Sequence, residues 1–199
     1  MNFLAHTLLG YPDSGLIAGG FIGDFVKGPV SDKIPLSLQR GIKLHRRIDS
    51  ISNQLPSMRG SYIHFGKSLR RFEPILLDVV ADHVLAREWE TYGNEYDLQT
   101  FTSIVYRDIR KFDLPPSSIE FYEHMSNTDL LGRYVETTTI ENAMRNILKR
   151  LDKAHLAPQL NGLLEAKINN FENDFKIYFP QIKNATKEYL STIRYPLKS

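Results

Sequence analysis

Apolar residues recur every three or four positions through almost the whole chain, the spacing that places them on one face of an α-helix. We find no convincing alternation of apolar and polar residues with hairpin turn signals, the pattern of a half-buried β-strand. Pro35 and Pro74 occupy first-turn positions, whereas Pro56 and Pro180 should end the helices before them. The predicted helices span 2–9, 14–27, 35–55, 57–71, 74–92, 98–112, 118–126, 137–151, 158–179 and 181–194. The fold class is therefore predicted to be all-α.

Length and composition favour one folded domain over residues 1–199. The chain is 42% hydrophobic and 24% charged, as folded proteins are, and its net charge of +2 gives no argument for nucleic-acid binding. No window of about 18 uninterrupted apolar residues occurs, so no membrane association is expected. The first residues lack the pattern of a signal peptide, and a cytoplasmic location is expected.

The chain contains no cysteine, which excludes disulfides, zinc-thiolate sites and cysteine nucleophiles together. A bound metal would need His, Asp, Glu or Asn as ligands. Three stretches place such residues in unusual surroundings.

The first stretch is 74–89, whose apolar residues cover nearly every side of a helix and so predict a buried helix. Asp78, Asp82 and His83 then have little access to water. A buried carboxylate without a partner costs several kcal/mol, so each acid needs a cation, a metal or several hydrogen-bond donors. The alternative is a solvated notch or an ion pair with Arg87.

The second stretch, 14–28, places Asp24 in an apolar, glycine-rich helix. Gly19, Gly20 and Gly23 each weaken a helix by roughly 1 kcal/mol relative to Ala, so their small size should be needed for close helix packing. Such packing would bring Asp24 near a partner helix, as a metal site between helices requires. Alternatively, Asp24 is an ordinary surface residue near a helix end.

The third stretch is "KLHRRIDS", in which His45 and Asp49 are one helical turn apart and face the same way. Such a pair forms either two metal ligands or one ligand with its orienting partner. Arg46 and Arg47 could bind phosphate, because a guanidinium matches two phosphate oxygens. An exposed charged helix face explains the same pattern. His6 could complete the site from the first helix or could be a core residue.

Together these stretches supply an oxygen and imidazole ligand set, in helices that lie mainly within residues 1–92. This chemistry suits Mn²⁺, Mg²⁺ or Fe²⁺ and does not exclude Zn²⁺. A metal of this kind can activate water and neutralise a phosphoryl oxygen. The candidate metal ligands are Asp24, His45, Asp82, His83 and His6.

The sequence resembles the acyl carrier protein phosphodiesterases, an all-α family related to the HD-type metal phosphohydrolases. The resemblance rests on ordered blocks and is dense only over residues 1–90. The blocks are "MNFLAH" at 1–6, "GDFVKG" at 23–28, "GIKLHRRID" at 41–49, "LP" with "R" at 55–59 and "LDVVADHVLAREW" at 77–89. It implies an HD-like bundle with a metal site between helices.

The resemblance also implies a function in lipid metabolism: hydrolysis of the phosphodiester that joins 4′-phosphopantetheine to a serine of holo-acyl carrier protein, with Mn²⁺ as the preferred cofactor. HD-type enzymes have His before Asp, whereas Asp82 precedes His83 here, so ligand roles cannot be carried over for that pair. Asp24 is the position carried over most directly.

The resulting hypothesis gives catalytic roles to Asp24, Arg46, Arg47 and Asp49, with the metal activating a water for in-line attack on phosphorus. Acyl carrier proteins are acidic, so a basic docking face is expected. Its candidate residues, which a solvated surface explains equally well, are Lys43, Arg46, Arg47, Arg59, Lys67, Arg70 and Arg71. Two alternatives stay open: a phosphohydrolase of nucleotides or other small phosphodiesters, and a non-catalytic protein that binds acyl carrier protein.

Overall fold

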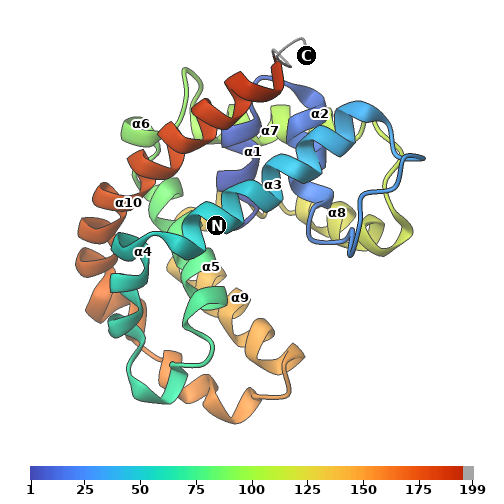
Figure 1. Ribbon diagram of the computed structural model, residues 1–199. Coiled ribbons are helices and arrows are strands. Elements are labelled where there is room, and N and C mark those ends of the chain that lie inside the picture. Colours follow the sequence, from blue (N-terminus) through green and yellow to red (C-terminus); the bar gives the residue numbers. More distant parts are fainter. Residues whose placement is uncertain (195–199) are drawn as a thin grey trace.

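The computed structural model describes residues 1–194, with side chains through residue 192, and shows helices and loops without a strand in that range. This confirms the all-α prediction (Figure 1). The α-helices are α1 (Phe3–Gly10), α2 (Ser14–Ile22), α3 (Leu36–Gln54), α4 (Pro56–Gly60), α5 (Glu73–Arg87), α6 (Trp89–Tyr92), α7 (Leu98–Ile109), α8 (Pro116–Asn127), α9 (Thr137–Arg150) and α10 (Leu163–Arg194). Short 3₁₀ helices are η1 (Ser61–Phe65), η2 (Lys67–Leu69), η3 (Gly132–Val135) and η4 (Ala154–Leu160).

Five of the predicted helices have clearly different extents. The helix expected over 74–92 is α5, which ends at Arg87, followed by the short helix α6. The helix expected over 14–27 ends at Ile22, where a turn follows, so Asp24 lies outside it. The helix expected over 57–71 is instead α4, η1 and η2, because Gly66 adopts a left-handed conformation with φ of 76°. The helices expected over 158–179 and 181–194 form the single helix α10, which continues through Pro180. Its apolar residues on both sides of the proline are buried, and this packing offsets the lost hydrogen bond.

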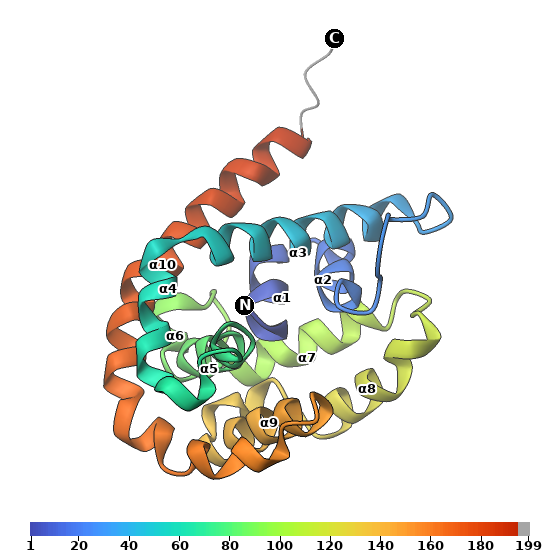
Figure 2. The same cartoon turned by 60° about the horizontal axis from the view of Figure 1, so that its bottom comes forward.

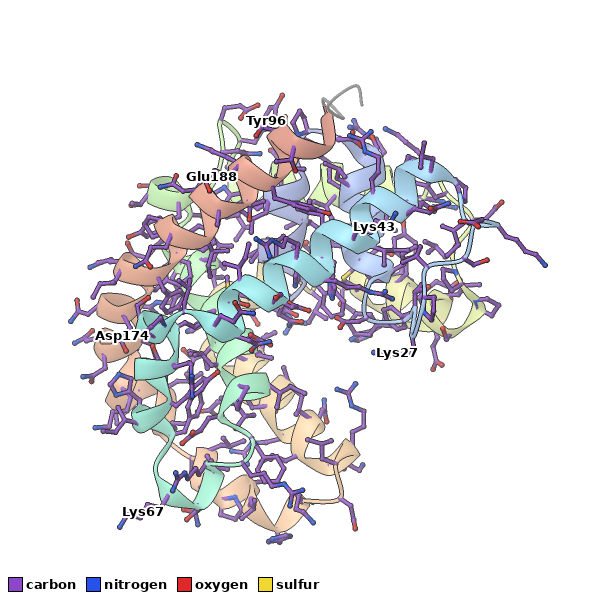
Figure 3. The ribbon with its side chains drawn as sticks, viewed as in Figure 1. Lys27, Lys43, Lys67, Tyr96, Asp174 and Glu188 are labelled. Carbon is purple, nitrogen blue, oxygen red and sulfur yellow. The ribbon has the colours of Figure 1, made fainter. Side chains whose placement is uncertain are left out.

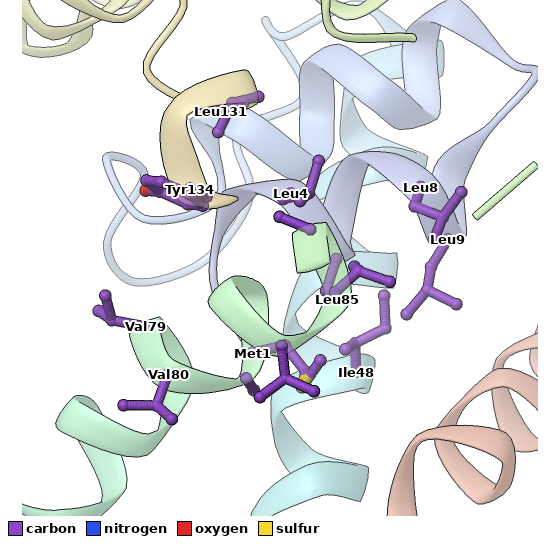
Figure 4. Packing of buried hydrophobic residues seen from close by; sticks show 14 of the residues in the cluster. Met1, Leu4, Leu8, Leu9, Ile48, Val79, Val80, Leu85, Leu131 and Tyr134 are labelled. Carbon is purple, nitrogen blue, oxygen red and sulfur yellow. The ribbon is translucent and has the colours of Figure 1, made fainter. Parts of the chain in front are cut away.

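Helix α5 lies in the middle of the bundle, and its apolar residues are buried on most sides, as its sequence predicts. Both views show α3 passing across α1 and α2, while α10 runs along the outside of the molecule (Figures 1 and 2). The chain start lies between α3 and α5 in these views. Its side chains pack into the core beside Ile48 and Leu85 (Figure 4).

Buried apolar side chains from Met1 to Ile182 form one continuous cluster. The single domain over residues 1–199 stays a prediction, and its last residues, 195–199, lie outside the described part. None of the described helices is both long enough and apolar enough to cross a membrane.

Candidate metal centre

Helices α2 and α3 approach each other closely because glycines face each other across their contact. A Cβ atom added to Gly19 would lie 2.5 Å from Cα of Gly41, and one added to Gly41 would lie 2.5 Å from the carbonyl oxygen of Gly15. Real side chains do not approach so closely, so these positions need glycine. The close contact brings the turn after α2, and Asp24 with it, against the middle of α3.

His45 packs against the end of α2, beside Gly20 and Gly23, and its side chain is 4% exposed. Its Nδ1–H donates to the carbonyl oxygen of Gly20 at 2.9 Å, which turns Nε2 toward two carboxylates. Asp49 Oδ2 lies 3.2 Å from Nε2, and Asp24 Oδ1 lies 3.6 Å from it. A backbone carbonyl that fixes one ring nitrogen is the usual way in which proteins orient a metal-binding histidine.

His6 joins the group from α1. Its ring stacks on that of His45 with centroids 4.0 Å apart, and its Nε2 lies 3.1 Å from Asp49 Oδ1. One atom each from His6, His45 and Asp49 lie within 4.8 Å of one another, a group that could hold a metal ion. Asp49 thus contacts both histidines, and its side chain remains 38% exposed.

The two histidines differ in charge. Burial lowers the pKa of His6 to about 4, and the positive charge of His45 adds to this effect. Burial also acts to lower the pKa of His45, but hydrogen bonds and the charges of Asp24 and Asp49 outweigh it and raise the pKa to about 9. Burial acts to raise the pKa of both carboxyls, but His45 holds each below its ordinary value. At neutral pH, His45 is therefore protonated and His6 is neutral.

A cavity of about 310 Å³ opens beside this group. Its lining combines the two aspartates and His45 with two cations and the loop that follows α2. The lining residues are Gly23, Asp24, Val26, Lys27, Gly28, His45, Arg46 and Asp49. The cavity therefore presents both positively charged side chains and candidate metal ligands to a group that enters it.

The predicted phosphate-binding arginines have different surroundings. Arg46 lines the cavity, and its Nη2 donates to the carbonyl oxygen of Val26 at 2.9 Å, which ties the cavity loop to α3. Arg47 is exposed and lies 6.0 Å from the ring centroid of Tyr189 on α10. The structure thus places Arg46, but not Arg47, in the cavity wall.

Arg46 is half-buried, and the other residues of the predicted docking face are exposed. Lys43 lies on α3. Lys67 lies at the tip of the segment formed by η1 and η2, and Figure 3 shows it well away from Lys27 and Lys43. Arg59, Arg70 and Arg71 belong to the same segment as Lys67 or to its ends. These residues are therefore spread over two regions of the molecule.

Asp78 and Asp82 on α5 face the chain start. Asp78 Oδ1 accepts a hydrogen bond from the Met1 amine at 2.5 Å. Asp82 is fully buried and accepts from the backbone N–H groups of Leu4 at 2.7 Å and of Asn2 and Ala5 at 3.3 Å each. Burial raises the pKa of Asp82 to about 7, although the Met1 amine and these N–H groups act to lower it. Both carboxylate oxygens of Asp82 therefore bind backbone N–H groups at the start of the chain, in place of the metal that the sequence suggested.

His83 is fully buried at a different place. Its Nδ1–H donates to the carbonyl oxygen of Tyr134 at 2.6 Å. It lines a second cavity, of about 380 Å³, with Arg87, Thr137, Leu164, Glu165 and Ile168. This cavity is not lined by His6, His45 or Asp49, so the structure does not bring His83 to the group that these three residues form.

The residues that meet at the first cavity fit a divalent metal. Two imidazoles and a carboxylate converge, with a second carboxylate from Asp24 beside them. A Cβ atom on Gly23 would lie 2.4 Å from Cγ of His45, so the glycine leaves room for the ring. This donor set suits Mn²⁺ or Fe²⁺.

Sequence reasoning missed Lys27 at this site, and it gave Gly23 only a general role in helix packing. Lys27 lines the cavity and Gly23 makes room for His45. Both stand in the block "GDFVKG", so the block itself contained the signal.

Comparison with known proteins agrees with the resemblance seen in the sequence. The family model described as acyl carrier protein phosphodiesterase matches residues 1–182. Similar proteins named acyl carrier protein phosphodiesterase occur in Salmonella newport (strain SL254), Escherichia coli (strain K12 / DH10B) and Shigella boydii serotype 18. Each is 30% identical over 190 residues, which cover 92% of this chain and 95% of the relative. No solved structure matches the chain. The chain belongs to the acyl carrier protein phosphodiesterase family.

Proposed function

We propose that this protein is a metal-dependent phosphodiesterase that hydrolyses holo-acyl carrier protein to apo-acyl carrier protein and 4′-phosphopantetheine. The observation that carries the proposal is the convergence of His6, His45 and Asp49 beside a cavity that basic side chains also line. Family membership and the names of the relatives supply the substrate. The kinship with HD-type enzymes belongs to the same proposal.

His6, His45 and Asp49 would hold the metal, with Asp24 as a further ligand or as the hydrogen-bond partner of His45. Mn²⁺ is the preferred ion, and Mg²⁺ and Fe²⁺ are alternatives. A bound divalent ion supplies a lowered pKa for water and charge neutralisation at phosphorus. The chain's own contribution is to orient the ligands: the carbonyl oxygen of Gly20 fixes the ring of His45.

Arg46 and Lys27 would bind the substrate phosphodiester. Arg46 keeps guanidinium nitrogens beyond the one bound to Val26, and these can donate to a non-bridging phosphate oxygen. Lys27 adds a mobile point charge on the same cavity. Arg46 belongs to α3 but is bonded to Val26, the residue before Lys27 in the loop. The two cations would hold the phosphate near Asp24 and Asp49, and a bound metal would neutralise the repulsion between like charges there.

The most direct test is mass spectrometry of holo-acyl carrier protein after incubation with this protein and Mn²⁺. We expect the mass of the phosphopantetheine group to be lost, and chelation to prevent the loss. Unchanged holo-carrier beside hydrolysed nucleotides would favour the small-phosphodiester alternative. Binding of the carrier without hydrolysis, at any metal concentration, would favour the non-catalytic alternative.

Asp24→Ala is the variant that tests the site. The side chain of Asp24 is 49% exposed, so its removal should leave the fold intact while it removes a carboxylate from His45. We expect hydrolysis to be abolished. Asp32→Ala, at an exposed aspartate of the loop that follows α2, is the matched control and should keep full turnover. Wild-type turnover in Asp24→Ala would contradict the role given to this residue.

A further inference from the structure

Asp82 was one of the candidate metal ligands in the sequence. In the structure, both of its carboxylate oxygens accept hydrogen bonds from backbone N–H groups. Oδ2 accepts from Leu4, and Oδ1 accepts from Asn2 and Ala5. All three donors belong to the start of α1, whereas Asp82 comes from α5, nearly 80 residues further along the chain.

Helix α1 needs this acceptor. The first N–H groups of any helix lack partners inside the helix, and a side chain just before it usually accepts from them. Asn2 occupies that position, but its side chain makes no such bond and donates to the hydroxyl of Tyr134 instead. Since α1 is buried from Leu4 onward, water cannot replace the missing acceptor. The carboxylate of Asp82 fills this place, and its negative charge suits the positive end of the helix.

The same anchor governs the position of His6. Ala5, which donates to Asp82, directly precedes His6, and the N–H of His6 closes the first helical turn on the carbonyl oxygen of Asn2. On the far side, the backbone of His6 lies against Gly20. A shift or rotation of the first turn of α1 would therefore move the imidazole relative to His45 and Asp49.

We infer that Asp82 is a positioning residue of the metal centre: it fixes the first turn of α1 so that the His6 imidazole meets His45 and Asp49. The inference rests on the proposed function, because it takes these three residues as the metal centre. It gives a buried acid of α5 a role that needs no contact with metal or substrate.

Asp82→Asn tests the inference, because the amide keeps the size of the side chain but places an NH₂ group against backbone N–H groups and removes the negative charge. Asp97→Asn is the matched control. Asp97 also accepts from a helix N-terminus, through the N–H of Thr100 at 2.8 Å, but the helix is α7 and carries none of the candidate ligands. Asp82→Glu keeps the charge and the acceptor oxygens but adds a methylene group, which should displace α1 without removing its anchor.

Three measurements are made on each purified protein: the thermal melt, the dissociation constant for Mn²⁺ by calorimetry, and the ¹⁵N-histidine NMR spectrum of the metal-free form. We expect Asp82→Asn and Asp82→Glu to weaken Mn²⁺ binding by about tenfold or more, the range found for partners that orient metal ligands. We also expect shifted His6 resonances in both. Asp97→Asn should keep the wild-type affinity and the wild-type His6 signal, whatever it loses in melting temperature.

Wild-type Mn²⁺ affinity and unchanged His6 resonances in either Asp82 variant would overturn the inference. If Asp82→Asn does not fold, Asp82→Glu alone decides between the two results. Failure of the proposed function looks different: the wild-type protein itself would then bind no Mn²⁺, while the His6 resonances of the metal-free variants would still report whether Asp82 positions this ring.

Discussion

Gly23 is the residue on which the geometry of His45 depends most directly. Its backbone is ordinary, with φ of −54°, so alanine is excluded only by space: the added Cβ would lie 2.4 Å from Cγ of His45. We predict that Gly23→Ala displaces the ring, destabilises the protein by about 1–3 kcal/mol as overpacking does, and abolishes hydrolysis. Denaturant unfolding and turnover of holo-acyl carrier protein measure the two effects.

Gly60→Ala is the control for this prediction. Gly60 has a similar backbone, with φ of −57°, but an added Cβ would meet no atom within 4 Å. We expect near-normal stability and turnover. If the two variants behaved alike, the contact between Gly23 and His45 would not be the cause.

The proton on His45 makes the stability of the metal-free protein depend on pH. Its pKa of about 9 in the folded protein lies above the ordinary value of 6.5, so this contribution is complete below pH 6.5 and is lost as the pH rises through 9. We predict that the melting temperature in chelator falls between pH 7 and 9. Asp24→Asn removes one carboxylate that raises this pKa, so its fall should be smaller.

The Met1 amine, whose pKa is also raised, contributes a fall to both proteins alike, so the difference between them reports His45. Parallel curves for the wild type and Asp24→Asn would contradict the assignment. Thermal melts at fixed ionic strength are sufficient for this comparison.

At the residue scale, sequence reasoning reached as far as helical spacing could take it. His45 and Asp49 are one turn apart, and this spacing is enough to place them on one face. The burial of Asp82 also followed from its apolar surroundings. Its partner did not, because a buried carboxylate can be satisfied by a metal or by backbone donors, and only the position of α1 decides between them. His83 is the next residue in the chain. It faces another cavity because neighbouring residues on a helix point about 100° apart.

At the scale of elements, the contact between α2 and α3 can be tested at two adjacent glycines. A Cβ on Gly19 would lie 2.5 Å from Cα of Gly41, whereas one on Gly20 would lie 3.4 Å from the nearest atom, the carbonyl oxygen of His6. We predict that Gly19→Ala separates the two helices and lowers the free energy of unfolding by about 1–3 kcal/mol. Gly20→Ala should be close to neutral, because its contacts are ordinary and alanine favours the helix.

Because Asp24 follows α2 while His45 and Asp49 belong to α3, Gly19→Ala should also weaken Mn²⁺ binding. Chemical denaturation and metal titration of the two variants test both parts. Equal stability of Gly19→Ala and Gly20→Ala would show that the helices can separate without cost.

The helices themselves could be predicted in type but not always in extent. Periodicity identified α3 to within one residue at each end, because a long amphipathic pattern has few other solutions. It also identified the start of α5, but it did not register that this helix ends at Arg87 instead of residue 92. Pro180 misled the prediction, since the rule that proline ends a helix holds only where packing does not compensate. The segment 57–71 failed for the opposite reason: its pattern is helical, but Gly66 introduces a turn that periodicity does not register.

At the scale of the whole molecule, some of the basic residues lie near the candidate metal centre and others lie far from it. The overall charge is only +2, yet Lys27 and Arg46 line the cavity and Lys43 lies exposed on the same helix as Arg46. An acidic carrier protein that delivers its phosphodiester to this cavity would approach over these residues. The basic residues near Lys67 lie elsewhere, so the sequence could identify basic residues but could not show which of them share a region with the site (Figure 3).

Charge reversal on α3 should therefore slow capture of the carrier without altering the chemistry. We predict that Lys43→Glu lowers kcat/KM at low salt by about fivefold, the equivalent of roughly 1 kcal/mol for an exposed pair, while kcat stays unchanged. Added salt should lower kcat/KM of the wild type and reduce the difference between the two proteins. Lys176→Glu makes the same change in net charge on α10 and should behave as the wild type. Equal losses in both variants would mean that overall charge, rather than a docking face on α3, governs encounter with the carrier.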